Sequence, residues 1–179
     1  RTIRDAIEIL GQEVLDVTGG KYPSGTRRGV WIEGPELSLE CLRYMYRLLF
    51  LFYAEANPRL NILDLKDPIY ASGYSIEALR ELESVRLRTP VEKTGTYLWE
   101  SLKRTLTLLY EGNSTAMRLP AVKVSLLDSE STPILNAINL RNEAIQKVIK
   151  LLSLKQSRKG TTRISYAKLG IGQLGAVYE

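Results

Sequence analysis

The 179-residue sequence contains no histidine and a single cysteine, Cys41. Without histidine, the chain cannot assemble a Ser-His-Asp triad, a Cys-His dyad or a histidine-ligated zinc site from its own residues. One cysteine is too few for an internal disulfide or a thiolate metal site, and its isolation fits a reducing compartment. We therefore predict no metal site, and no chemistry that depends on histidine, within this chain.

Long apolar runs are also missing. The longest covers residues 48–53, which is far too short to cross a bilayer. The first residues are charged and follow a helical pattern, which is not typical of a secretory signal. These absences predict a cytoplasmic protein with no membrane partner.

The apolar residues that are present follow helical spacing over most of the chain. Apolar content of 44% and charged content of 25% are typical of globular proteins, so we expect a single helical domain over residues 1–179, with a candidate sub-boundary near residues 19–34. We predict a mostly α fold: an irregular multi-helix bundle with long loops and at most one short β element, since residues 122–126 alternate like a strand without an evident partner. The predicted helices cover residues 1–17, 35–57, 75–84, 97–111 and 139–152.

Positive charge is concentrated near the end of the chain. Residues 141–168 contain eight Lys and Arg residues and one acid, Glu143, and such a segment is typical of contact with a polyanion. Within it, a polar stretch with one glycine predicts a flexible basic loop at 155–163. Its cations are our candidates for contact with the DNA backbone: Lys155, Arg158, Lys159 and Arg163. The alternative is a solvated loop that only adds charge.

The predicted helix 35–57 contains charges on or near its apolar stripe. Glu55 follows Leu48 and Leu51 at helical spacing, so we expect a half-buried carboxylate that needs a partner, with arginine as the favoured one. Arg43 and Arg47 lie one turn apart and are candidates to pair with other acids or with phosphate. No nucleophile or base accompanies Glu55, which favours a structural role over catalysis.

Two short motifs resemble known sites without their context. Residues 170–175 read G-x-G-x-x-G, but a dinucleotide site also needs a following helix and an acid about 20 residues downstream. Asp64 and Lys66 match half of a nuclease D-x-K site, but the preceding segment is a predicted helix rather than a strand. We interpret the first motif as helix punctuation and the second as a turn.

Two longer stretches resemble a known family. RYMYRLLFLFYAEANPRLNIL at 43–63 and RISYAKLGIGQLGAVYE at 163–179 resemble the helical region ahead of the catalytic domain in large adenine-specific DNA methyltransferases. These are type IIG restriction–modification enzymes and methyltransferases of the BREX and DISARM phage-defence systems. The likeness extends over about residues 35–179, and the start at Arg1 also leads us to expect a fragment of a larger protein.

The resemblance implies a non-catalytic spacer. Gly170, Gly172 and Gly175 would form the hinge into a catalytic domain of the same polypeptide, which binds S-adenosylmethionine and methylates adenine N6 in DNA. The family's N-P-P-Y motif and glycine-rich cofactor motif are absent here, so no catalytic or cofactor-binding residue is expected and no cofactor in this fragment. Implied partners are DNA, the catalytic domain and other defence-system subunits. The alternative is a protein-interaction scaffold that docks partners through the long helix without touching DNA.

Overall fold

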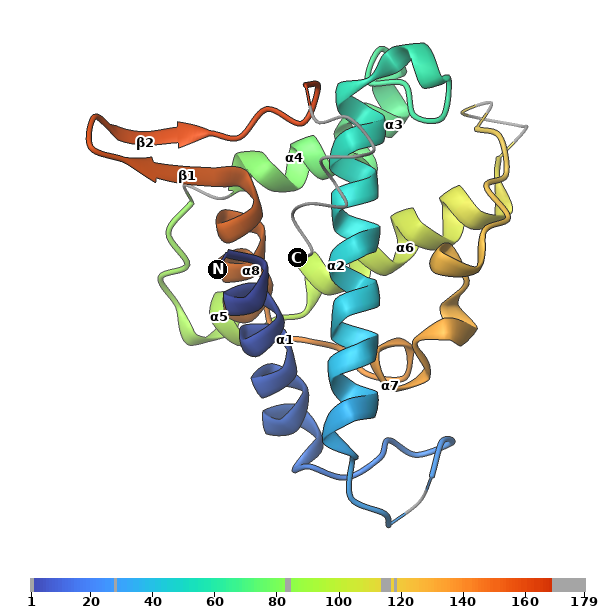
Figure 1. The fold of residues 1–179 in the computed structure, drawn as a ribbon, viewed down its shortest axis with the longest axis vertical. Helices are drawn as coiled ribbons and strands as arrows, with labels where there is room; N and C mark the ends of the chain where they lie inside the picture. Colours follow the sequence, from blue (N-terminus) through green and yellow to red (C-terminus); the bar gives the residue numbers. More distant parts are fainter. Residues whose placement is uncertain (1, 28, 83–84, 114–116, 118, 169–179) are drawn as a thin grey trace.

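The computed structural model describes residues 2–27, 29–82, 85–113, 117 and 119–168, and it confirms the predicted mostly α fold (Figure 1). Its regular elements are helices of very different length and one β-hairpin. The helices are α1 (Thr2–Thr18), α2 (Gly34–Ala56), α3 (Pro68–Gly73), α4 (Ile76–Glu81), α5 (Pro90–Thr94), α6 (Tyr97–Glu111), α7 (Pro133–Asn136) and α8 (Asn142–Ser153). Short 3-10 turns are η1 (Pro58–Leu60), η3 (Ser125–Leu127) and η4 (Ser129–Ser131), and the strands are β1 (Leu154–Ser157) and β2 (Gly160–Arg163).

Helix α2 is the centre of the molecule. It begins at Gly34 with Pro35 in its first turn, where the missing N–H of proline costs nothing. Twelve of its 23 residues are buried, because it packs against α1 on one side and against α4, α7 and η3 elsewhere. Figure 1 shows it as the long vertical helix between α1 and α8 on one side and α7 on the other.

Helices α1 and α8 pack against each other, although they are far apart in the sequence. The buried face of α1 carries Ala6, Leu10 and Val14, which recur at the i, i+4 spacing of an amphipathic helix. Helix α6 also packs on α8, and its Trp99 is fully buried against Tyr44 of α2, with ring centroids 4.5 Å apart. Residues on both sides of the 19–34 segment therefore belong to one hydrophobic core.

Buried glutamates cap short helices from a distance. Glu40 of α2 accepts the backbone N–H groups of Ile134 and Leu135 at the start of α7, at 3.1 and 3.0 Å. Glu55 accepts those of Ile76 and Glu77 at the start of α4, at 2.7 and 3.0 Å. A helix N-terminus presents unpaired N–H donors and a positive dipole end, so each carboxylate satisfies groups that the short helix cannot satisfy itself.

This arrangement corrects the expected partner of Glu55. The side chain is buried, as its position on the apolar stripe predicted, but its partners are the start of α4 and the hydroxyl of Tyr70, not an arginine. Backbone donors supply the compensation that a guanidinium would have supplied. Sequence spacing showed the need for a partner and could not show that a short helix would be placed there.

The predicted basic loop at 155–163 contains an antiparallel hairpin. Lys155 pairs with Thr162 and Gln156 with Thr161, and Ser157 closes the turn by pairing with Gly160. Among the described residues, the two-stranded sheet lies at 154–163 rather than at 122–126, where residues 122–124 form no strand and η3 begins at Ser125. No helix among the described residues is long and apolar enough to cross a membrane.

Three helix boundaries test the capping predictions. Gly112 ends α6 and Ser75 caps α4 through a bond to the backbone of Ala78, both as predicted. The predicted start at Asn139 is wrong, because α8 begins at Asn142. At this start, Asn142 Oδ1 accepts the backbone N–H of Leu98 and Asn142 Nδ2 donates to the carbonyl of Glu92, so the first residue of α8 is held by tertiary contacts.

Candidate nucleic-acid interface

The β-hairpin presents cations at its end. Lys155 lies on β1 and Arg158 and Lys159 lie in the turn, and all three side chains are exposed. The turn is ordered by local hydrogen bonds: Ser157 Oγ donates to the carbonyl of Gly160 at 2.8 Å and accepts from the N–H of Lys159 at 3.3 Å. Gly160 has φ of +116°, a backbone conformation that only glycine adopts readily.

Arg163 belongs to a different part of the hairpin. Its Nη1 donates to Glu77 Oε1 at 2.7 Å, which joins β2 to α4. Of the four predicted backbone-contacting cations, Arg163 is therefore engaged with an acid of the protein. Arg158 and Lys159 lie together in the turn at the free end, and Lys155 lies on β1 near the base, opposite Thr162. None of these three has an ion pair to a residue that the structure describes.

The base of the hairpin is fixed to the body by Arg80. This side chain is buried and donates to two backbone carbonyls. One belongs to Ser153, just before β1, at 3.2 Å, and the other to Ile164, just after β2, at 3.0 Å. Its guanidinium lies 5.1 Å from the ring centroid of Phe52 in α2, within cation–π range. The hairpin thus has an anchored base and an exposed cationic end.

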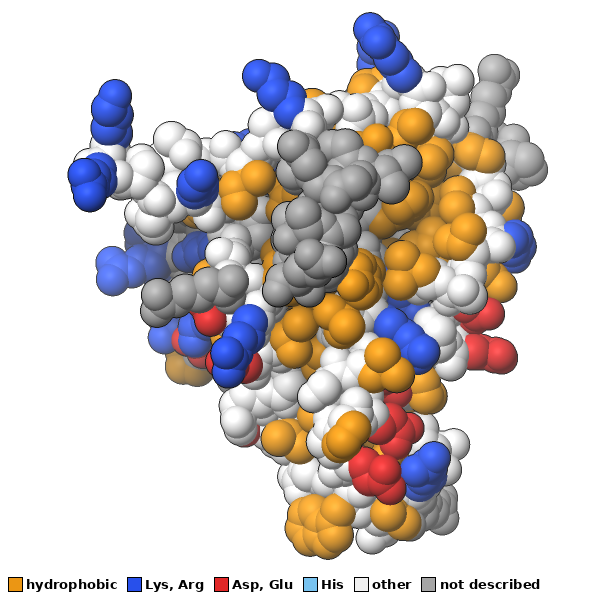
Figure 2. Space-filling model, viewed as in Figure 1, with side chains coloured by type: hydrophobic (Ala, Val, Ile, Leu, Met, Phe, Trp, Pro, Cys, Tyr) orange, Lys and Arg blue, Asp and Glu red, His pale blue; other side chains and the backbone are white. Residues whose placement is uncertain are grey.

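The positive charge of the hairpin is not balanced by acids within residues 154–163. Residues 154–163 contain no acid, and Figure 2 shows Lys and Arg side chains projecting from the hairpin beyond the rest of the surface. Nearby on α8, Lys147 is paired with Glu143 at 3.6 Å. A cationic protrusion without acids attracts a polyanion and repels basic surfaces.

Arg43 and Arg47 are not part of this interface. Arg43 donates to the carbonyl of Ser131 at 2.9 Å, and Arg47 is buried among carbonyl and hydroxyl oxygens of residues 126–132. Both arginines hold this segment against α2 rather than binding phosphate at the surface. Asp64 accepts the backbone N–H of Lys66 at 2.8 Å, which confirms the interpretation of the D-x-K motif as a turn.

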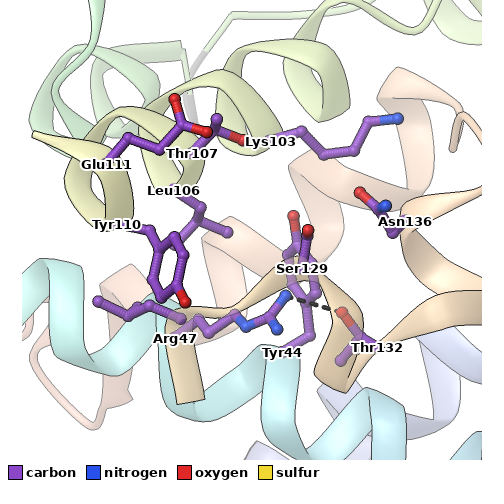
Figure 3. Close-up of a pocket in the computed structure, with 11 residues that line it drawn as sticks. Tyr44, Arg47, Lys103, Leu106, Thr107, Tyr110, Glu111, Ser129, Thr132 and Asn136 are labelled. Atoms are coloured by element: carbon purple, nitrogen blue, oxygen red, sulfur yellow. Dashed lines mark hydrogen bonds between the residues drawn. The ribbon is translucent and has the colours of Figure 1, made fainter. Parts of the chain in front are cut away.

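The structure also shows a pocket that sequence reasoning missed. It lies between α2, α6 and residues 125–136, and Figure 3 shows its polar lining. The lining residues come from three segments that only tertiary packing brings together, so no local motif indicated the pocket. The one available signal was the pair Tyr44 and Arg47, a hydroxyl and a cation on an apolar helix.

Among the described residues we find neither a metal site nor a reactive thiol. No group of three or more His, Cys, Asp or Glu residues in the described ranges is arranged to hold a metal ion. Burial raises the pKa of the Cys41 thiol to about 12, so it stays protonated and unreactive. The predicted hinge glycines Gly170, Gly172 and Gly175 lie outside the described residues.

Comparison with known proteins gives no relative. No protein-family model, no curated protein and no solved structure matches this chain.

Proposed function

We propose that this chain is a non-catalytic helical spacer of a site-specific adenine-N6 DNA methyltransferase of a bacterial restriction–modification or phage-defence system. In this role its hairpin contacts the DNA backbone, while the catalytic domain of the same polypeptide binds S-adenosylmethionine. The observation that carries DNA contact is the anchored hairpin with Arg158 and Lys159 exposed in its turn and Lys155 exposed on β1. The methyltransferase assignment is supported by the sequence resemblance at 43–63 and 163–179.

The geometry suits phosphates better than bases. Exposed Lys and Arg side chains on a narrow protrusion neutralise phosphate charge, and such contacts carry no sequence information. A two-stranded hairpin of four residues per strand presents side chains from both faces. We therefore propose positioning on DNA without sequence selection by this chain.

The test is the salt dependence of DNA binding by the triple variant Lys155→Ala, Arg158→Ala, Lys159→Ala. Each phosphate contact contributes about 0.9 to the slope of log Kobs against log salt concentration, so losing three contacts reduces the slope by roughly 2 to 3. Binding should weaken equally on unrelated duplex sequences, as measured by fluorescence anisotropy.

A matched control removes the same charge elsewhere. Arg59, Lys66 and Lys93 are exposed and lie outside the hairpin, so their triple alanine variant also lowers the net charge by three. We expect this control to keep most of the wild-type slope. Equal slopes for wild type and the hairpin variant, or equal losses in both variants, would reject the hairpin as the contact.

The methyltransferase part has its own test. Reading the coding sequence beyond Glu179 should show an N-P-P-Y motif, and the longer protein should transfer labelled methyl groups from S-adenosylmethionine to adenine in DNA. Absence of the motif with no adenine methylation would reject this part and leave the DNA contact standing.

The scaffold alternative is less well supported by the surface of α2. This helix is described throughout, and Leu39 is its only exposed large apolar side chain. A helix that docks partners usually presents an apolar face of several residues. We therefore place DNA contact first, and a pull-down that recovers protein subunits but no DNA would reverse this order.

A further inference from the structure

The pocket between α2, α6 and residues 125–136 is large enough for a small ligand. Its volume is about 90 Å³, several times what one water molecule needs. Helix α2 contributes its floor, α6 its opposite wall, and η3 to α7 its side, as Figure 3 shows. The lining residues are Tyr44, Arg47, Lys103, Leu106, Thr107, Tyr110, Glu111, Leu127, Ser129, Thr132 and Asn136.

Tyr44 places an unsatisfied hydroxyl in this pocket. The residue is 2% exposed, its ring is stacked on Trp99, and its hydroxyl has no hydrogen-bond partner among the described residues. In Figure 3 the hydroxyl points from α2 into the space below α6. Burial raises the pKa of this phenol far above its ordinary value, so it remains protonated and can donate to a ligand.

Arg47 brings a buried positive charge to the same wall. Four of its five N–H donors are used: Nε to the carbonyl of Leu126, Nη1 to Thr132 Oγ1, and Nη2 to the carbonyl of Asp128 and to Ser131 Oγ, all within 2.8 Å. None of these acceptors is a carboxylate. The guanidinium is 3% exposed and therefore has fixed geometry but no counter-ion in contact.

Lys103 supplies a second cation from the α6 side. Its Nζ donates to the carbonyl of Ile138 and to Asn139 Oδ1, at 3.1 and 2.9 Å, and no carboxylate of the described chain lies within ion-pair distance. Burial lowers the pKa of this amine, as expected for a cation without a compensating anion. The pocket therefore has two such cations and one lining acid, Glu111.

We propose that this pocket binds a small ligand bearing an oxyanion, either a phosphate or a carboxylate. The anion would lie between Arg47 and Lys103 and accept the hydroxyl of Tyr44, with Ser129 and Thr132 as further neighbours. This placement compensates two charges and satisfies one buried donor together, which water can do only in part. Asp128 Oδ2 accepts the hydroxyl of Tyr110 at 3.2 Å, and Glu111 is the exposed last residue of α6. Neither acid forms an ion pair with Arg47 or Lys103 in the described part of the chain.

Anion binding in this pocket does not depend on contact between the hairpin and DNA. In Figure 1 the hairpin lies on one side of α2 and the segment of η3 to α7 lies on the other. Disabling the hairpin cations therefore leaves this pocket intact, and an anion bound here leaves the hairpin free.

The experiment measures ligand binding by thermal shift and by titration calorimetry. The probes are inorganic phosphate and, separately, a series of small carboxylates from acetate to succinate, each against chloride at equal ionic strength. We expect a saturable rise in Tm with one of the two classes. A response to phosphate alone identifies a phosphate site, and a response to carboxylates alone identifies a carboxylate site.

The decisive variant is Tyr44→Phe. It removes only the unpartnered hydroxyl, so the free protein should keep its Tm, while the apparent Kd for the responding anion should rise at least tenfold. Tyr46→Phe removes a hydroxyl from the same helix outside the pocket and should leave the Kd unchanged. No rise in Tm beyond that of chloride, or equal Kd values for Tyr44→Phe and wild type, would overturn the proposal.

Discussion

At the scale of single residues, buried charges in this protein are compensated by backbone groups more than by opposite charges. Glu40 and Glu55 accept N–H groups of helix starts, and Arg47 donates to carbonyls and hydroxyls. Glu13 and Arg80 also have opposite charges as partners: Arg141 Nε donates to Glu13 Oε1 at 2.7 Å, and Arg80 Nη1 lies 3.5 Å from Glu77 Oε2. Burial raises the pKa of both Glu40 and Glu55, and the backbone N–H groups that they accept offset only part of this rise.

Glu55 should therefore make stability depend on pH. Burial is the main cause that raises its pKa to about 7, although its three hydrogen bonds act in the opposite direction. The folded protein then holds a proton up to about pH 7 that the unfolded chain releases near its ordinary value of 4.5. Between these values the folded state binds more protons, so the free energy of unfolding falls as pH rises.

The measurement is urea unfolding from pH 5 to pH 8. We expect wild type to lose roughly 2 to 4 kcal/mol through this group over the full window, and Glu55→Gln to show a clearly smaller loss. Glu143→Gln, at an exposed position on α8, serves as the control and should keep the wild-type slope. Parallel slopes for wild type and Glu55→Gln would show that Glu55 is ionised throughout.

At the scale of elements, short helices and turns depend on close contacts with the rest of the chain. The C-terminus of α6 is the clearest case, because Gly112 has φ of +78° and the following segment returns against it. A Cβ atom on Gly112 would lie 2.8 Å from the backbone nitrogen of Ala121. Two constraints, the left-handed backbone and the close approach, therefore require glycine at this position.

Gly112→Ala should lower the free energy of unfolding by about 2 to 4 kcal/mol, because strain and the clash with backbone act together. Gly19→Ala is the matched control, since Gly19 also has positive φ of +63° but has open space around its Cβ position. The control should lose about 1 kcal/mol. Thermal or urea unfolding of both variants measures the difference, and equal losses would mean that the segment at Ala121 moves away without cost.

At the scale of the whole molecule, contacts between helices far apart in the sequence join α1 to the main core. Helix α1 packs on α2 and α8, so its apolar face completes the core rather than forming a separate unit. Leu10 on this face is 1% exposed, whereas Leu15 on the same helix is 37% exposed. Loss of packing at Leu10 should therefore lower the stability of the whole core and not of α1 alone.

Leu10→Ala should lower the free energy of unfolding by about 2 to 5 kcal/mol, the range for truncation of a fully buried leucine. Leu15→Ala should cost less than about 1 kcal/mol. Near-UV circular dichroism reports Trp99 in the core and far-UV reports the helices, so both signals should shift to the same lower midpoint in Leu10→Ala. Separate midpoints would indicate that α1 unfolds independently.

The sequence by itself determined the long amphipathic helices, the proline and glycine that bound them, and the burial of Glu55, because periodicity and capping act within a few residues of chain. It also determined that positive charge gathers at 155–163. Tertiary structure decided which partners these groups contact: Glu55 binds the start of α4, and Arg163 binds Glu77. It also placed Asn142, at the start of α8, against the backbone of Leu98. The pocket at Tyr44 is likewise tertiary, since its atoms come from α2, α6 and residues 127–136, which local propensity cannot bring together.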